Sequence, residues 1–162
     1  MKTTESEPDP HSRRIEGLDE EDPGFGLWIS IINRSAQSYF QHYLQDLGVG
    51  PGQQAYLLAI SPGETIKQEE LVHRLKVDRA NVTRALQSLE RSGCIRRSGD
   101  PNDRRAKAIS LSEEGIAVRA QVLEVAKSWI DILKSTVTPK EWSQVQRILE
   151  KMALRLTEKT QN

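Results

Sequence analysis

Cysteine is almost missing from this 162-residue chain, which contains one, Cys94. A single cysteine excludes an internal disulfide and any multi-cysteine metal site within one chain. The chain also lacks an apolar run long enough to span a bilayer, and its polar, acidic N-terminus is not a secretory signal. The composition therefore predicts a cytoplasmic protein that has no membrane partner.

The chain also lacks a net charge at pH 7, because its 23 basic and 23 acidic side chains balance. The charges are unevenly distributed along the chain. Residues 1–22 carry three basic and eight acidic side chains, a net charge of −5, whereas residues 71–107 carry ten basic and four acidic ones, a net charge of +6. Since the local field rather than the net charge steers a polyanion, the middle of the chain is a candidate surface for nucleic acid.

The length is enough for one domain with a core and short for two. Residues 1–23 combine prolines and acids with few large apolar side chains, which predicts a flexible acidic tail. We expect residues 24–162 to form a single domain.

Apolar residues at three- and four-residue spacing predict a long helix from Phe25 to Leu47 and a short helix over 55–60. Thr65 and Gln68 form a capping box, which predicts that a third helix starts at Thr65. Asp78 is a second N-cap, and the helix after it runs from Arg79 to about Ser92, before the left-handed stop expected at Gly93.

A hairpin and two long helices complete the expected order. Residues 95–98 and 106–111 are predicted strands around a turn over 99–102. Ser112 starts one long helix, and a capping box of Thr138 and Glu141 starts the last. The fold class is therefore mainly α with a small β-hairpin wing, that is, a winged helix-turn-helix.

The helix after Asp78 has two different faces. Val82, Ala85, Leu86 and Leu89 would pack on the preceding helix, whereas the opposite face is polar. Arginine can bridge the acceptors of guanine, and asparagine or glutamine can pair with adenine. A solvated helix face has the same composition, but the capped helix before it and the basic hairpin after it favour DNA. The predicted DNA-binding residues of this helix are Arg79, Asn81, Thr83, Arg84, Gln87 and Ser88.

The hairpin supplies a second group of candidates, which are Asp103, Arg104, Arg105 and Lys107. A narrow minor groove has enhanced negative potential and attracts an inserted guanidinium. Asp103 would orient an arginine by accepting a hydrogen bond from it. An ordinary charged turn is the alternative interpretation.

The stretch from Leu71 to Gly115 resembles the MarR family of bacterial winged helix-turn-helix regulators. The resemblance is carried by "VDRANVTRALQSLERSGCIRR", by "DPNDRRAKAISLS", which holds the family's Asp-x-Arg pattern at Asp103 and Arg105, and by the following "EEG". It implies a homodimer whose helices over 24–48 and 112–160 interlock, with a DNA-binding region over 51–111. It further implies a palindromic DNA site and, in most relatives, repression relieved by small phenolic ligands, oxidation or metal. The long acidic tail departs from the family.

Other chemistry has little support in the sequence. Cys94 follows the expected DNA-reading helix, which runs from Arg79 to about Ser92. We expect it to be a packing residue, with a redox sensor as the alternative. His11, His42 and His73 lack metal-ligand spacing, and no hydrolytic motif or phosphate-cradling glycine loop occurs. We therefore expect no enzyme activity, no metal site and no cofactor.

The sequence thus predicts a sequence-specific, double-stranded DNA-binding transcriptional regulator. It would act as a homodimer on a pseudo-palindromic operator, and as a repressor that responds to a small-molecule inducer. The alternative is a winged-helix module that binds an acidic protein partner.

Overall fold

The structure is a computed structural model that describes residues 24–100 and 103–159, and their side chains apart from those of residues 100, 103–107 and 157–159. The described residues fall into two units, one that ends at Ser38 and one that begins at Tyr39. The elements in chain order are α1 (Phe25–Leu44), a 3-10 turn (Gln45–Leu47), α2 (Gln54–Leu58), β1 (Thr65–Lys67), α3 (Gln68–Leu75), α4 (Arg79–Arg91), β2 (Ile95–Asp100), β3 (Asp103–Leu111), α5 (Glu113–Lys134) and α6 (Pro139–Lys159).

The three strands form one antiparallel sheet in the order β1-β3-β2. The predicted helix start at Thr65 is wrong, because Thr65 lies in β1 and pairs with Ser110 of β3. In the same strand Ile66 is opposite Ile109, and both side chains are buried. This long-range pairing outweighs the local capping pattern, so α3 begins at Gln68 without a side-chain cap.

The wing strands are longer than the sequence predicted. Pairing continues past the expected strand ends, with Gly99 opposite Lys107 and Asp100 opposite Asp103 after a register shift. By their backbone, residues 103–105 therefore belong to strand β3 rather than to a turn. Residues 101 and 102 lie outside the described part of the chain.

Three other predicted helix starts are confirmed by hydrogen bonds, whereas α1 ends at Leu44 rather than at Leu47 and α2 covers Gln54–Leu58 rather than 55–60. Asp78 accepts from the Asn81 amide at 2.8 Å, and Ser112 accepts from the Gly115 amide at 2.9 Å. At α6 the Thr138 amide donates to Glu141 at 2.8 Å. Gly93, which follows α4, has the expected left-handed backbone with φ 77°.

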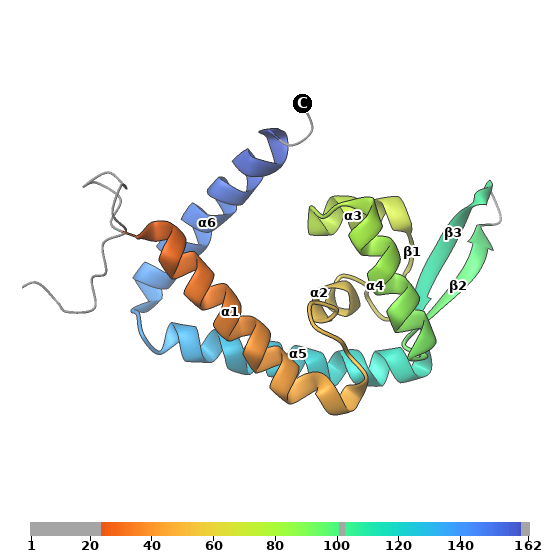
Figure 1. The fold of residues 1–162 in the computed structure, drawn as a ribbon, viewed down its shortest axis with the longest axis horizontal. Coiled ribbons are helices and arrows are strands. Elements are labelled where there is room, and N and C mark those ends of the chain that lie inside the picture. Colours follow the sequence, from red (N-terminus) through yellow and green to blue (C-terminus); the bar gives the residue numbers. More distant parts are fainter. Residues whose placement is uncertain (1–23, 101–102, 160–162) are drawn as a thin grey trace, which may run out of the picture. The chain divides into compact units, whose positions relative to one another are not determined.

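The hydrophobic core joins the winged part to the first half of α5. Leu57 of α2, Leu71 of α3 and Leu86 of α4 are fully buried together with Ile109 of β3 and Val122 of α5. α3, α4 and the three strands consequently lie together at one end of α5 (Figure 1).

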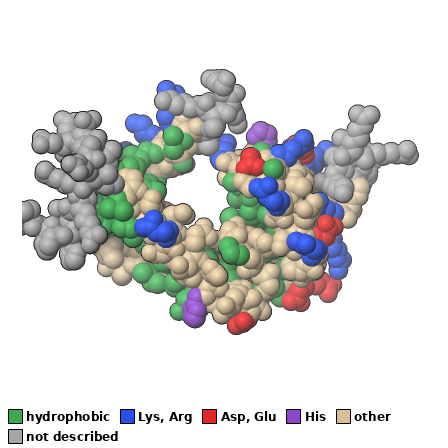
Figure 2. All heavy atoms as spheres, in the orientation of Figure 1, with side chains coloured by type: hydrophobic (Ala, Val, Ile, Leu, Met, Phe, Trp, Pro, Cys, Tyr) green, Lys and Arg blue, Asp and Glu red, His purple; other side chains and the backbone are tan. Residues whose placement is uncertain are grey.

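The terminal helices leave large apolar side chains exposed. On α1 these include Phe25, Trp28 and Ile32, and on α6 they include Ile148 and Leu149. Figure 2 shows hydrophobic side chains on the surface along α6. Within the described ranges, no helix is both long and apolar enough to cross a bilayer.

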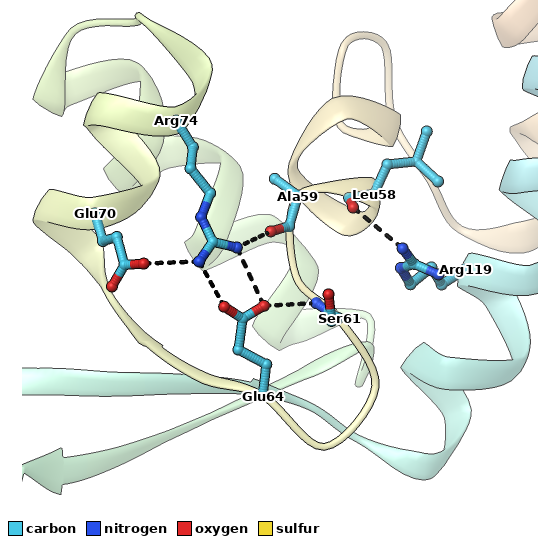
Figure 3. Close-up of polar contacts among 7 residues, drawn as sticks. All are labelled: Leu58, Ala59, Ser61, Glu64, Glu70, Arg74 and Arg119. Atoms are coloured by element: carbon cyan, nitrogen blue, oxygen red, sulfur yellow. Dashed lines mark hydrogen bonds and ion pairs between the residues drawn. The ribbon is translucent and has the colours of Figure 1, made fainter.

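A network around Arg74 holds α3 to the loop that precedes it (Figure 3). The Arg74 guanidinium donates to both carboxylate oxygens of Glu64, at 2.5 and 3.1 Å, to Glu70 at 2.7 Å and to the Ala59 carbonyl at 2.8 Å. Glu64 also accepts from the Ser61 amide at 2.8 Å. The end of α2, the following turn and α3 are thus joined through one side chain.

We expect a Glu64→Gln variant to lose stability in a pH-dependent way. The hydrogen bonds from Arg74, and then that from the Ser61 amide, lower the pKa of Glu64 to about 2. A lowered carboxyl pKa stabilises the fold above the pKa of the unfolded chain, near 4.5, and this contribution disappears as the pH falls towards 2. The melting temperature of the variant should therefore be lower at about pH 7 and approach the wild-type value in acid.

Thermal unfolding followed by circular dichroism measures this difference. The effect should be modest, because 37% of the Arg74 side chain and 24% of the Glu64 side chain are exposed to solvent. Glu150→Gln, at an exposed site on α6, is the control. A difference between wild type and Glu64→Gln that stays constant from pH 7 to pH 2 contradicts the assignment.

Candidate nucleic-acid interface

Helix α4 has the two faces that the sequence predicted. Val82, Leu86 and Leu89 are completely buried, and Ala85 packs against the same core. On the opposite side Arg79, Asn81, Arg84 and Gln87 are exposed, as is Arg91 in the last turn. The helix therefore presents a row of polar side chains on an element that its apolar face fixes in place.

Two of the predicted contact residues are less accessible than the rest. Thr83 and Ser88 are half-buried. The Thr83 hydroxyl donates to the Arg79 carbonyl and accepts from the Gln68 side chain, both at 2.8 Å. This hydroxyl therefore joins α3 to α4, a role that the sequence did not indicate.

The exposed polar side chains are linked to one another. The Asn81 side chain donates to the Asp78 carboxylate and accepts from the Arg84 guanidinium. Arg79 forms an ion pair with Glu69 of α3, although both side chains are largely in solvent. These contacts orient the hydrogen-bonding groups at the start of α4, which is the end that enters the groove in helix-turn-helix proteins.

A pocket of about 280 Å³ lies beside this face. Asn81, Arg84 and Ala85 of α4 line one side of it, and residues 51–53 with Tyr56 line the other. Burial, and then the nearby Asp78 carboxylate, raise the pKa of Tyr56, which keeps its phenol protonated. The outer face of α4 is thus hollowed on the side next to α2.

The four wing candidates remain predictions. Asp103, Arg104, Arg105 and Lys107 lie on β3 by their backbone, but their side chains are outside the described part of the structure. Nearer the base of the wing, Arg96 is exposed on β2. Figure 2 shows several Lys and Arg side chains over the winged part.

The turn between α4 and β2 is in close contact with the start of α5. The Cys94 carbonyl accepts from the Ser112 amide at 3.0 Å, and the Ser112 hydroxyl donates to the Gly93 carbonyl at 2.5 Å. A Cβ on Gly115 would lie 1.7 Å from the Cys94 carbonyl oxygen. Sequence reasoning missed the role of Gly115, although the "EEG" motif contained it.

Cys94 itself is 1% exposed, with its thiol 3.4 Å from the Ser92 hydroxyl. Burial fits the packing role, since a sensing thiol needs access to its oxidant. Among the described residues, no group of three His, Cys, Asp or Glu side chains could hold a metal ion.

A capped reading helix that packs on a preceding helix and is followed by a β-hairpin defines a winged helix-turn-helix protein. Residues 51–107 match the family model described as "MarR family". The chain belongs to the MarR family of transcriptional regulators.

Comparisons with individual proteins agree with this assignment. A crystal structure of MarR superposes with a TM-score of 0.72 at 31% identity, covering 88% of this chain and 98% of the other. A cysteine-to-serine mutant of Escherichia coli MarR, solved with operator DNA, superposes with a TM-score of 0.72 at 26% identity over 83% of this chain and 99% of its own. The transcriptional repressor MdtR of Bacillus subtilis is 29% identical over 132 residues, which are 77% of this chain and 85% of MdtR.

Proposed function

We propose that this chain is a sequence-specific, double-stranded DNA-binding repressor that acts as a homodimer on a pseudo-palindromic operator. The observation that carries the proposal is the row of exposed polar side chains at the start of α4, opposite a fully buried apolar face. Two similar proteins support the proposal, since E. coli MarR was solved with operator DNA and MdtR is a transcriptional repressor. We also propose that a small-molecule inducer releases the protein from its operator, as is typical of the family.

In the proposed complex, Arg79, Asn81, Arg84 and Gln87 reach base edges or phosphates in the major groove, with Thr83 and Ser88 at the margin. Asp103, Arg104, Arg105 and Lys107 of the wing serve the flanking minor groove. The proposed function is recognition of DNA without catalysis, and the proposed location is the cytoplasm.

The dimer would form through the terminal helices, over residues 24–48 and 112–160, with the DNA-binding region over 51–111 between them. The exposed apolar side chains of α1 and of α6 support this division, because large exposed apolar surfaces mark interaction sites. The expected acidic tail over residues 1–23 lies outside the described part of the chain.

The test is selection of duplexes from a random pool, followed by binding at several salt concentrations. A pseudo-palindrome with half-site centres about one helical turn apart is expected. The affinity should fall steeply with salt, with a logarithmic slope of about −0.9 for each phosphate neutralised. A module that binds an acidic protein would enrich no site and would bind random duplex with little salt dependence.

A further inference from the structure

One arginine of the wing points back to the reading helix rather than out to solvent. Arg97 lies on β2, and its Nε is 3.0 Å from the Glu90 Oε2 atom in the last turn of α4. The Arg97 side chain is only 10% exposed, whereas that of Glu90 is 44% exposed. The pair therefore connects α4, which carries the proposed major-groove contacts, to β2, the strand that pairs with the proposed wing contacts on β3.

The alternation of β2 explains how Arg97 comes to be buried. Ile95 and Arg97 lie on the same side of the strand, and Ile95 is 3% exposed, while Arg96 and Ser98 on the other side are exposed. Arg97 also sits opposite the buried Ile109 of β3. The aliphatic part of the Arg97 side chain thus lies on the buried side of the wing. Its guanidinium reaches the C-terminal end of α4, where the helix dipole favours a positive charge.

The guanidinium is poorly satisfied apart from this ion pair. Among the described contacts, the buried Nη2 of Arg97 has no hydrogen-bond partner, and Nε approaches Glu90 without hydrogen-bond geometry. A buried charge with few partners depends strongly on its counter-ion. Removing Glu90 would therefore leave the Arg97 guanidinium without its described counter-ion and free the side chain to leave its buried position.

We propose that the Glu90–Arg97 pair is a strut that fixes the angle between α4 and the wing, which makes Arg97 a positioning residue for DNA binding. This inference rests on the proposed function. Once α4 has entered the major groove, a fixed wing meets the flanking groove as an intramolecular step at high effective concentration. A wing whose outer part can shift relative to α4 would lose that advantage without losing any DNA contact of its own.

A purely electrostatic role makes the opposite prediction for Glu90. If the two residues act on DNA only through charge, Glu90→Gln removes a negative charge and tightens binding, and Arg97→Gln weakens it. If the pair is a strut, both substitutions weaken binding, and the double variant is no weaker than either single one.

The experiment measures the affinity of Glu90→Gln, Arg97→Gln and the double variant for a duplex that the wild type selects from a random pool. Each is also tested on two versions of this duplex, one with A·T-rich and one with G·C-rich flanks, because A-tracts narrow the minor groove. Arg96→Gln is the matched control, because it removes the same charge from the exposed side of the same strand. Melting temperatures show whether each variant folds. If Arg97→Gln does not fold, Glu90→Gln decides the result, because it alters an exposed side chain.

We expect Glu90→Gln to weaken operator binding about tenfold, within the coupling range of contacting residues. It should also reduce the preference between flanks while leaving the preference at central positions and the salt slope unchanged. Arg96→Gln should shift the salt slope and keep the flank preference. Tighter binding by Glu90→Gln, or additive effects in the double variant, overturns the strut while the proposed function stands; a wild type that selects no duplex overturns both.

Discussion

A Gly115→Ala variant is expected to lose about 3 kcal/mol or more of its free energy of unfolding. The added Cβ would lie 1.7 Å from the Cys94 carbonyl oxygen and 2.7 Å from its carbon, and these are backbone atoms that cannot rotate away. The same carbonyl accepts from the Ser112 amide, so a shift would also disturb the start of α5. Urea or thermal unfolding followed by circular dichroism measures the loss.

Gly26→Ala is the matched control for this prediction. Gly26 is also a helical glycine, on α1, and a Cβ added there would meet nothing within 4 Å beyond its chain neighbours and its own helix backbone. Alanine there should be neutral or stabilising by up to about 1 kcal/mol, because alanine is the better helix former. Equal stabilities of the two variants would show that α5 does not approach Cys94 as closely as described.

Arg84→Ala is expected to weaken binding to the selected operator by about 1–3 kcal/mol and to relax the preference at one position of each half-site. Arg84 is exposed on the outer face of α4, and its contact with Asn81 holds the guanidinium near the groove-entering end of the helix. Measuring the affinity for the operator and for single-base variants of it separates base contact from phosphate contact.

Arg91→Ala provides the control on the same helix. Arg91 lies two turns further along, in the last turn of α4, and is also exposed. Its removal should weaken binding to all sequences alike and reduce the salt slope by about 1. If Arg84→Ala also acts uniformly on every sequence, Arg84 contacts only the phosphate backbone.

Local patterns predicted most of this fold correctly. The caps at Asp78 and Ser112 and the capping box at Thr138 depend on neighbours within three residues, and the structure confirms all three. The buried face of α4 follows from helical periodicity in the same way. The outward face of α4 was predicted as the side opposite the apolar one. Thr83 was therefore predicted to bind DNA, and its hydrogen bond with Gln68, 15 residues earlier in the chain, was not foreseen.

The main errors and omissions involve contacts between different elements of the fold. Thr65 has the chemistry of a cap, but its pairing with Ser110 places it in a strand. Gly115 shows no sign in its own helix that it faces Cys94. The burial of Arg97 depends on strand alternation and on its contact with Glu90, which the sequence alone did not indicate.

Strand β1 also constrains the order in which the domain can assemble. Residues 65–67 complete their hydrogen bonds only with residues 108–110, so all of α3, α4 and β2 must be synthesised before this part of the sheet closes. Closing a loop of this size is entropically costly and slows folding relative to local helix formation. On the ribosome, β1 would therefore find its partner strand only after β3 has left the exit tunnel.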